Sequence, residues 1–283
     1  MMSKRRFLNT IGLGGVGALL AACNRLTLFN AFTPKEKSVH RIATDVAYGS
    51  KPRQTYDVYA PVTGSHLPVL VFFYGGNWAS GSKSDYNWMG HALAAMGYVV
   101  ALPDYRLVPE VHYPDFVSDC ALAAKHIAQH AGDYGGDGSR LALSGQSAGA
   151  YNAAMVTLDP EFRGDLDIKA FVGISGPYDF YPFNVPASAN AFGQYPRPTE
   201  TQPITYARKV DTHILLMQSR ADTIVGTHNA VNLEARLKAA GTDVRLKLYD
   251  GLSHQDTAAV FSLPFRGKGT LYNDVKVFLA EVV

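Results

Sequence analysis

A serine flanked by glycines, at residues 145–149, is the pattern in this 283-residue sequence that most clearly could do chemistry. The stretch reads Gly-Gln-Ser-Ala-Gly, with Ser147 between an apolar run that ends at Leu143 and a helix-forming run from Ala148. A tight strand-to-helix turn of this kind strains the serine and exposes its hydroxyl above a sheet. The backbone N–H of Ala148, at the helix start, would face a developing oxyanion. The pattern therefore predicts a nucleophilic serine.

A serine hydroxyl is a weak nucleophile and needs a base, which needs an acid to orient it. In sites of this type the acid and then the histidine follow the serine along the chain. Three of the nine histidines follow Ser147. His213 begins a predicted strand and His228 a predicted helix, whereas His254 lies in a turn just after the last predicted strand. A turn at that edge of a sheet can reach the serine, so we predict His254 as the base.

Asp222 is the predicted acid because it lies in the loop that follows the run His213–Met217. It would hold the imidazole in its working tautomer and stabilise the imidazolium. Asp211 precedes that strand and so falls at the opposite edge of the sheet. Asp250 and Asp256 neighbour the histidine and remain alternatives. A helix cap is the structural alternative for Asp222.

A pair of glycines, Gly75 and Gly76, follows the apolar run Pro68–Phe73. Glycine lets backbone N–H groups approach a ligand closely, which an oxyanion hole requires. We therefore expect a second oxyanion donor from the loop Tyr74-Gly75-Gly76-Asn77-Trp78.

The elements that must position these residues alternate between short β-rich runs and longer helical ones. The alternation predicts an α/β fold with a mostly parallel sheet and helices on both faces, preceded by an antiparallel pair. The predicted strands are Val39–Tyr48, Thr55–Ala60, Pro68–Phe73, Tyr98–Leu102, Leu141–Leu143, Ile168–Ile174, His213–Met217 and Val244–Tyr249. The predicted helices are Tyr86–Met96, Phe116–His130, Ala148–Leu158, Thr227–Ala240 and Leu271–Val283.

Residues 176–206 interrupt this alternation of strands and helices with six prolines and seven aromatic residues. A loop this long inside a compact domain is usually functional. We interpret the segment as a cap or substrate-pocket insertion in the main domain, residues 38–283, with a structural excursion as the alternative.

The N-terminus reads as an export signal. Lys4, Arg5 and Arg6 precede an apolar run of about twelve residues, shorter than the roughly 20 needed to span a bilayer. The segment 3–8 resembles a twin-arginine signal with lysine in the first arginine position, so that route and the general secretory route both remain open. Leu20-Ala21-Ala22-Cys23 looks like a bacterial lipobox. We predict that residues 1–22 are removed, that Cys23 is lipidated, and that residues 23–37 form a short tether to the membrane.

Composition excludes several functions. The formal net charge is +2, and removal of residues 1–22 would leave 23 basic against 24 acidic residues, so no nucleic-acid partner is implied.

Besides Cys23 the sequence has only Cys120, which lies on an apolar helix stripe and is expected in the core. His126 and His130 share a helix face without a carboxylate pattern for zinc. No nucleotide-binding glycine motif occurs, and we expect neither cofactor nor metal. The oligomeric state stays open.

Taken together the motifs resemble the α/β-hydrolase superfamily over about residues 40–283. The resemblance is to carboxylesterases of the hormone-sensitive-lipase and acetyl-esterase type, including the feruloyl-esterase-like and arylformamidase-like branch. It rests on the serine motif, the glycine-pair loop, Asp104-Tyr105-Arg106-Leu107-Val108-Pro109-Glu110 and Ser175-Gly176-Pro177-Tyr178-Asp179. It implies Gly76, Asn77 and Ala148 as oxyanion donors, with Gly75 shaping the turn. Tyr74 departs from the family's usual histidine.

These observations predict a cofactor-independent serine hydrolase that cleaves carboxylic esters through an acyl-enzyme. Two alternatives remain. One is an amide hydrolase of arylformamidase type, and the other is a catalytically silent binding lipoprotein tethered to a membrane. The sequence leaves the ester and its acyl chain length open.

Overall fold

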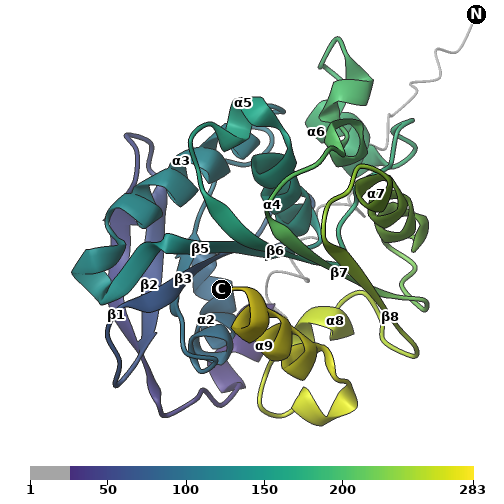
Figure 1. Cartoon of the computed structure of the whole chain (residues 1–283). Helices are drawn as coiled ribbons and strands as arrows, with labels where there is room; N and C mark the ends of the chain where they lie inside the picture. The colour runs from purple at the N-terminus through teal and green to yellow at the C-terminus, as the bar shows by residue number, and fades with distance from the viewer. Residues whose placement is uncertain (1–25) are drawn as a thin grey trace, which may run out of the picture.

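Eight strands form a single sheet in the computed structural model, which describes residues 26–283 (Figure 1). Their order across the sheet is β1-β2-β4-β3-β5-β6-β7-β8. The strands are β1 (Val39–Ala47), β2 (Thr55–Pro61), β3 (Leu67–Phe73), β4 (Val99–Pro103), β5 (Gly136–Gln146), β6 (Ile168–Ile174), β7 (His213–Ser219) and β8 (Val244–Tyr249). All eight predicted strands are therefore present.

The strand directions are those predicted from the hydrophobic pattern of the sequence. β1 pairs antiparallel with β2, and β2 pairs antiparallel with β4, whereas β3 to β8 all run parallel to one another. The last five residues of β3 are fully buried, as a strand covered on both faces requires. The prediction of a mostly parallel sheet with an initial antiparallel pair is confirmed.

Helices cover both faces of the sheet. In Figure 1, α3, α4 and α7 lie on one face, and α2 and α9 lie on the other. The five predicted helices correspond to α2 (Asn87–Ala94), α3 (Asp115–Gln129), α4 (Ala148–Leu158), α7 (His228–Ala239) and α9 (Leu271–Val282). Three short helices were not predicted: α5 (Pro160–Arg163), α6 (Pro186–Phe192) and α8 (Asp256–Ala259).

The loops that matter for chemistry leave the sheet at one edge. Because β3 to β8 are parallel, their carboxyl ends meet there, and we call it the carboxyl edge. The glycine-pair loop follows β3, Ser147 follows β5, Asp222 follows β7 and His254 follows β8. The topology alone therefore gathers the predicted residues at one edge.

The 176–206 segment also leaves the carboxyl edge, after β6. It contains α6 and the short 3₁₀ helices η3 (Pro198–Thr201) and η4 (Pro203–Tyr206). Phe192 on α6 is buried, and its ring centroid lies 4.7 Å from that of Trp78 and 5.3 Å from that of Phe180. The segment is thus held by an aromatic cluster that includes Trp78, the last residue of the glycine-pair loop.

The N-terminal part of the described chain corrects one expectation. We expected residues 23–37 to be a tether, but residues 26–32 are helical and lie against the domain. The ring of Phe29 packs edge-on to Trp88 at 5.3 Å and stacks on Phe265 at 5.9 Å. The side chain of Asn30 donates to the Ser84 carbonyl oxygen at 2.8 Å. Where it is described, this segment is docked. The predicted signal 1–22 and Cys23 lie outside the described residues.

Candidate active site

Ser147 stands at the turn between β5 and α4 with backbone angles of φ 55° and ψ −124°. A positive φ is unfavourable for a side-chain-bearing residue and marks a strained turn. The flanking glycines make the turn possible. A Cβ at Gly149 would lie 2.0 Å from the Phe73 carbonyl oxygen, and one at Gly145 would lie 2.3 Å from the Gly149 backbone. The predicted strand–turn–helix geometry of the serine is therefore present.

His254 and Asp222 form a close pair at the same edge. The His254 Nδ1 lies 2.7 Å from Asp222 Oδ2. Ser147, His254 and Asp222 are each 7% exposed, so the pair works in a largely water-free setting. This contact selects Asp222 among the candidate acids. Asp250 instead pairs with Arg220 at 3.1 Å, and Asp256 accepts hydrogen bonds from Ser253.

Asp222 is held as a carboxylate by several donors. Its Oδ1 accepts the backbone N–H groups of Ile224 and Val225, both at 2.9 Å, and its Oδ2 accepts Gln218 Nε2 at 3.0 Å. Burial alone would raise the pKa of Asp222, but the hydrogen bonds from His254 and from these two backbone groups outweigh it and lower the pKa. A charged Asp222 keeps a proton on His254 Nδ1, which leaves Nε2 facing the reaction side.

The sequence analysis did not predict the contact between Gln146 and His254. Its side-chain Nε2 lies 3.3 Å from His254 Nε2, the nitrogen that would take the proton of Ser147. Its Oε1 lies 2.7 Å from the position a Cβ on Gly75 would take. The Gln146 carboxamide thus fills the space between the imidazole and the glycine-pair loop. Its place directly before the serine was the only signal in the sequence.

The loop that carries His254 is braced from two other elements. The hydroxyl of Thr257 donates to the His254 carbonyl oxygen at 2.7 Å, and the hydroxyl of Ser175 donates to Thr257 at 3.1 Å. Ser219 donates to the Leu252 carbonyl oxygen at 2.6 Å. Ser175 belongs to a motif that the sequence marked without a role, and its role here is to support the histidine loop.

The glycine-pair loop lies directly against the serine turn. A Cβ on Gly75 would come within 3.1 Å of both the Gln146 carbonyl oxygen and the Ser147 Cβ. Gly76 has a φ of +136°, and Asn77 follows at +56°, so the chain turns sharply here. Ala148 begins α4, where helix N–H groups have no intrahelical acceptor. Gly75 and Ala148, two of the residues predicted for the oxyanion hole, therefore lie beside Ser147.

Hydrogen bonds of Tyr74 hold the start of this loop in place. Its hydroxyl donates to Asp104 Oδ1 at 2.6 Å and accepts from Arg53 Nη2 at 2.8 Å, while the Tyr105 hydroxyl donates to the Tyr74 carbonyl oxygen at 2.8 Å. Burial and the adjacent Asp104 raise the pKa of Tyr74 well above its usual value, so the hydroxyl stays a donor. Arg106 pairs with Asp119 through two hydrogen bonds of 2.8 Å. The motif at 104–106 thus fixes the loop.

Other candidates lie apart from this site. Cys120 is buried and unpaired, as expected of a core residue. His126 and His130 stack on each other at 4.0 Å, and residues 26–283 contain no cluster of three metal-ligating side chains. In that same range no helix is long and apolar enough to cross a membrane.

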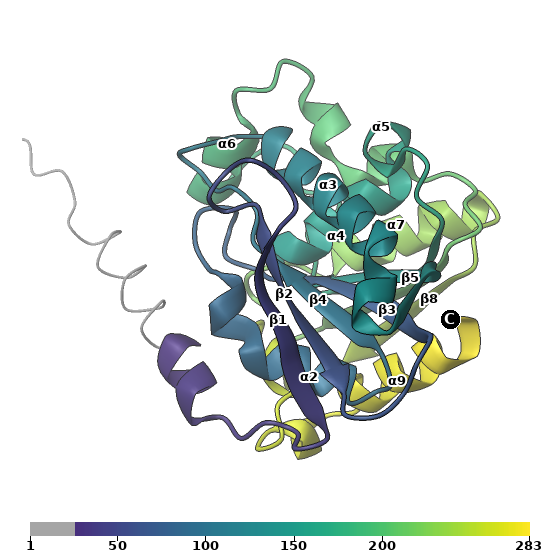
Figure 2. The same cartoon turned by 90° about the vertical axis from the view of Figure 1, so that its left-hand side faces the viewer.

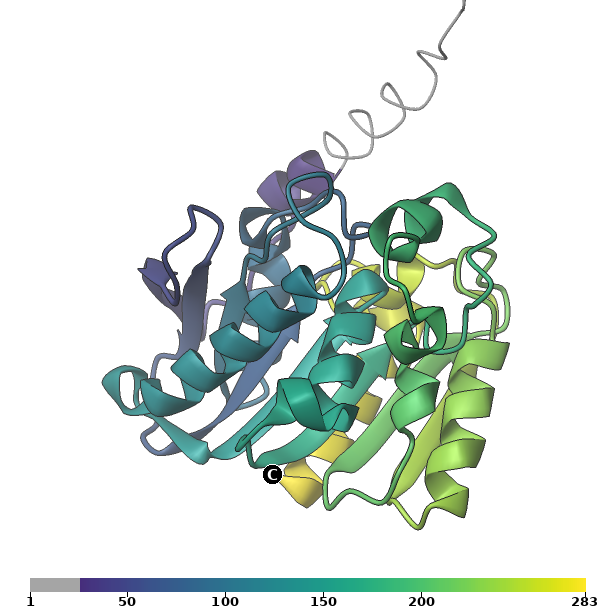
Figure 3. The same cartoon turned by 90° about the horizontal axis from the view of Figure 1, so that it is seen from above.

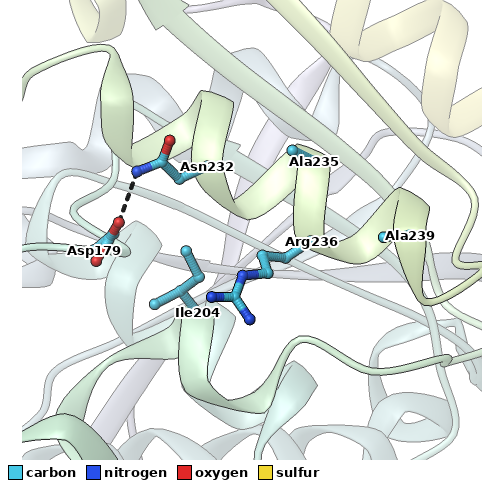
Figure 4. Close-up of a pocket in the computed structure, with 6 residues that line it drawn as sticks. All are labelled: Asp179, Ile204, Asn232, Ala235, Arg236 and Ala239. Atoms are coloured by element: carbon cyan, nitrogen blue, oxygen red, sulfur yellow. Dashed lines mark hydrogen bonds between the residues drawn. The ribbon is translucent and has the colours of Figure 1, made fainter.

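A surface hollow of about 320 Å³ lies between α7 and η4 (Figure 4). It is lined by Asp179, Ile204, Asn232, Ala235, Arg236 and Ala239, and the Asn232 amide donates to Asp179 at 2.7 Å. None of the three residues of the candidate site lines it, so it is not the place where Ser147 would meet a substrate.

The sheet order and the carboxyl-edge site define the chain as an α/β-hydrolase, and comparisons with solved structures agree. Esterase B from Lactobacillus rhamnosis aligns with a TM-score of 0.79 at 17% identity, covering 94% of this chain and 95% of that one. A truncated carbohydrate esterase from gut microbiota aligns with a TM-score of 0.75 at 21% identity, covering 88% and 98%. More particularly, the chain belongs to the BD-FAE family, whose model matches residues 56–237.

A curated relative points in the same direction. The isoprenylcysteine alpha-carbonyl methylesterase ICME of Arabidopsis thaliana is 28% identical over 263 residues, which cover 83% of this chain. The match spans 61% of that relative's length. The relative and the solved structures named above are all esterases by name.

Proposed function

We propose that this chain hydrolyses carboxylic esters with Ser147 as nucleophile, His254 as base and Asp222 as orienting acid. The Ser147 oxygen forms a bond to the ester carbonyl carbon while its proton passes to His254 Nε2. The bond from that carbon to the leaving oxygen then breaks, and His254 returns the proton to the departing alcohol. Water repeats the sequence on the acyl-enzyme and releases the acid. The backbone N–H groups of Gly76, Asn77 and Ala148 would hold the oxyanion, with Gly75 shaping the turn.

The observation that carries the proposal is the 2.7 Å contact between His254 and Asp222 beside a strained serine turn. The histidine–aspartate contact or the serine turn, taken alone, could serve only to stabilise the fold. A serine with positive φ beside Gly75 of the glycine-pair loop, together with a histidine in contact with a buried carboxylate, supports acyl transfer. The esterase names of the relatives support esters as the substrate class.

Replacing Ser147 with alanine tests the proposal. We expect Ser147→Ala to lower kcat on a short-chain aryl ester by at least about 10³-fold, because the nucleophile is gone while binding remains. Ser144→Ala is the matched control, since Ser144 is a buried serine on β5, three residues before Ser147. A fluorophosphonate should label the unmutated chain and Ser144→Ala but not Ser147→Ala. Full activity of Ser147→Ala would contradict the assignment, and an unlabelled wild type would favour a silent binding protein.

An amide is the second substrate class to test, because the same acyl-enzyme chemistry can cleave an activated amide. Kinetics on an aryl formamide beside acetyl and feruloyl esters separate the two. We expect the esters to have the higher kcat/KM. A higher value for the formamide would move the assignment to the arylformamidase type.

We also propose that the chain is exported and anchored in a bacterial membrane through a lipid on Cys23. The basic start, the short apolar run and the small residues before Cys23 support this. Metabolic labelling with a fatty acid should mark the wild type and Cys120→Ala but not Cys23→Ser. Label retained on Cys23→Ser would contradict the anchor.

A further inference from the structure

Exposed large apolar side chains gather at the carboxyl edge. Tyr181 and Val185 follow β6, Ile224 stands two residues after Asp222, and Leu263 follows α8. Leu28 and Phe32, on the docked N-terminal helix, are 56% and 81% exposed. Leaving such side chains in water is unfavourable, and their concentration around a functional site indicates a contact surface. We call the set Leu28, Phe32, Tyr181, Val185, Ile224 and Leu263 the apolar rim.

The N-terminal helix (residues 26–32) belongs to this edge by its contacts. It touches Ser84 and Asp85, which follow the glycine-pair loop, and Trp88 at the start of α2. It also touches Phe265, in the segment that follows the His254 loop. Figures 2 and 3 both show this helix at the same edge as α6, with the site's loops between them. The N-terminal helix and the 176–206 segment therefore lie on either side of the site.

The helix presents its outer face as an apolar pair. Leu28 and Phe32 are four residues apart and so lie on one side of the helix, while Phe29 turns inward. Exposed Lys268 lies nearby, with its Nζ 4.7 Å from the centroid of Phe265 and 4.0 Å from Asp256 Oδ1. An apolar face beside a cationic group suits the surface of an anionic bilayer.

The position of Cys23 points to the same occupant. It precedes Leu26 by three residues, so a lipid on Cys23 would start within about 11 Å of the helix. We propose that the carboxyl edge rests on the membrane, with Leu28 and Phe32 inserted among the lipids, and that the enzyme takes an amphiphilic ester from that bilayer. The inference rests on the proposed ester hydrolysis and the proposed anchor, and it adds the orientation and the substrate class.

A fluorescence measurement tests the orientation without using activity. The full chain is placed in vesicles of phosphatidylethanolamine and phosphatidylglycerol whose acyl chains carry bromine. Leu28→Trp puts a fluorophore on the rim, and Val62→Trp puts one at the opposite edge on a side chain of nearly equal exposure, 57%. We expect bromine to quench the added fluorescence of Leu28→Trp and not that of Val62→Trp. Equal quenching of both, or of neither, would overturn the orientation.

A second copy of the chain is the competing occupant of the rim. Acrylamide, a quencher that stays in water, separates the two. If Leu28→Trp is shielded from acrylamide and is not quenched by brominated lipid, the rim contacts protein, and the membrane proposal is overturned. Shielding from acrylamide together with quenching by brominated lipid supports it.

Kinetics test the substrate class. We expect Phe32→Ser to lower turnover of a long-chain ester held in vesicles by about 10-fold or more, since a large apolar side chain no longer enters the bilayer. Turnover of a water-soluble ester should stay unchanged, and Val62→Ser should leave both rates unchanged. Equal vesicle rates for Phe32→Ser and wild type would overturn the delivery step. Failure of the wild type on both esters would instead overturn the proposed hydrolysis, while the quenching result would still decide the orientation.

Discussion

Replacing Tyr74 with phenylalanine removes one hydroxyl from the buried network that holds the glycine-pair loop. Two hydrogen bonds to charged groups are lost, the 2.6 Å bond to Asp104 and the 2.8 Å bond from Arg53. Each such bond is worth about 1.5–3 kcal/mol when its partner is left bare. Here Asp104 keeps the Lys83 backbone N–H at 2.7 Å, and Arg53 keeps the Gly81 and Tyr105 carbonyl oxygens. We therefore expect a net loss of only about 2 kcal/mol in the free energy of unfolding.

The same change should slow the reaction. Removing an oxyanion donor outright costs about 10²–10³-fold in kcat, and Tyr74→Phe leaves the donors present but less firmly held, so we expect about a 10-fold loss. The loss should appear in kcat and hardly in KM, because the oxyanion forms only in the transition state. The assay is steady-state hydrolysis of a short-chain aryl ester together with thermal unfolding.

Tyr249→Phe is the matched control for Tyr74→Phe. The Tyr249 hydroxyl also donates to a carboxylate, that of Asp274 on α9 at 2.8 Å, and β5, β6 and β7 separate β8 from β3, the strand that leads into the glycine-pair loop. We expect it to lose stability without losing kcat. If Tyr74→Phe lowers the melting temperature and leaves kcat at the wild-type value, the loop does not depend on the network, and the reasoning is refuted.

Three further predictions follow from the geometry. Gly75→Ala should lower kcat by about 10²-fold because its Cβ meets Gln146 and the serine turn, whereas Gly132→Ala, with open space around it, should be neutral. Asp222→Asn should lower kcat about 10⁴-fold by favouring the wrong tautomer of His254. The pKa of Asp222 is lower in the folded chain than its usual value of 3.8. The charged carboxylate therefore stabilises the fold fully above pH 3.8, and this stabilisation is lost as the pH falls through the folded pKa. Between these two values the free energy of unfolding in urea should depend less on pH for Asp222→Asn than for the wild type. Phe192→Ala should cost about 3–5 kcal/mol in thermal unfolding and admit longer acyl chains, whereas unchanged chain-length selectivity would contradict a pocket role for the aromatic cluster.

The sheet was predictable from the sequence because its strands are buried on both faces. A strand such as β3 reads as an unbroken apolar run, and its observed bounds, Leu67–Phe73, differ from the prediction by one residue. The long helices were found for a similar reason, since three turns give a visible period. Helices of four to seven residues, such as α5, α6 and α8, complete at most two turns, so no period can be seen.

The order of the strands and loops along the chain allowed much of the site to be predicted. Contacts that depend on how far a particular side chain extends could not be predicted. Loops after parallel strands must share an edge, so the positions of Ser147, Asp222 and His254 along the chain imply proximity. The contact of Gln146 with His254 depends on a rotamer, which no local pattern records. The docking of the N-terminal helix depends on Phe29 meeting Phe265 at the other end of the chain, a pairing that a single sequence does not reveal.

Tyr74 shows how a departure in sequence can be compensated in space. The longer side chain places its hydroxyl at Asp104, and Asp104 in turn binds the Lys83 N–H, so one carboxylate ties the start of the glycine-pair loop to the 3₁₀ turn η1 (Lys83–Tyr86) that follows it. Arg53 completes this network by donating to both the Tyr74 hydroxyl and the carbonyl oxygen of Gly81, three residues after that loop. The N-terminal helix then packs on Asp85, two residues further along. The η1 turn therefore contacts both the buried network that holds the glycine-pair loop and the N-terminal helix.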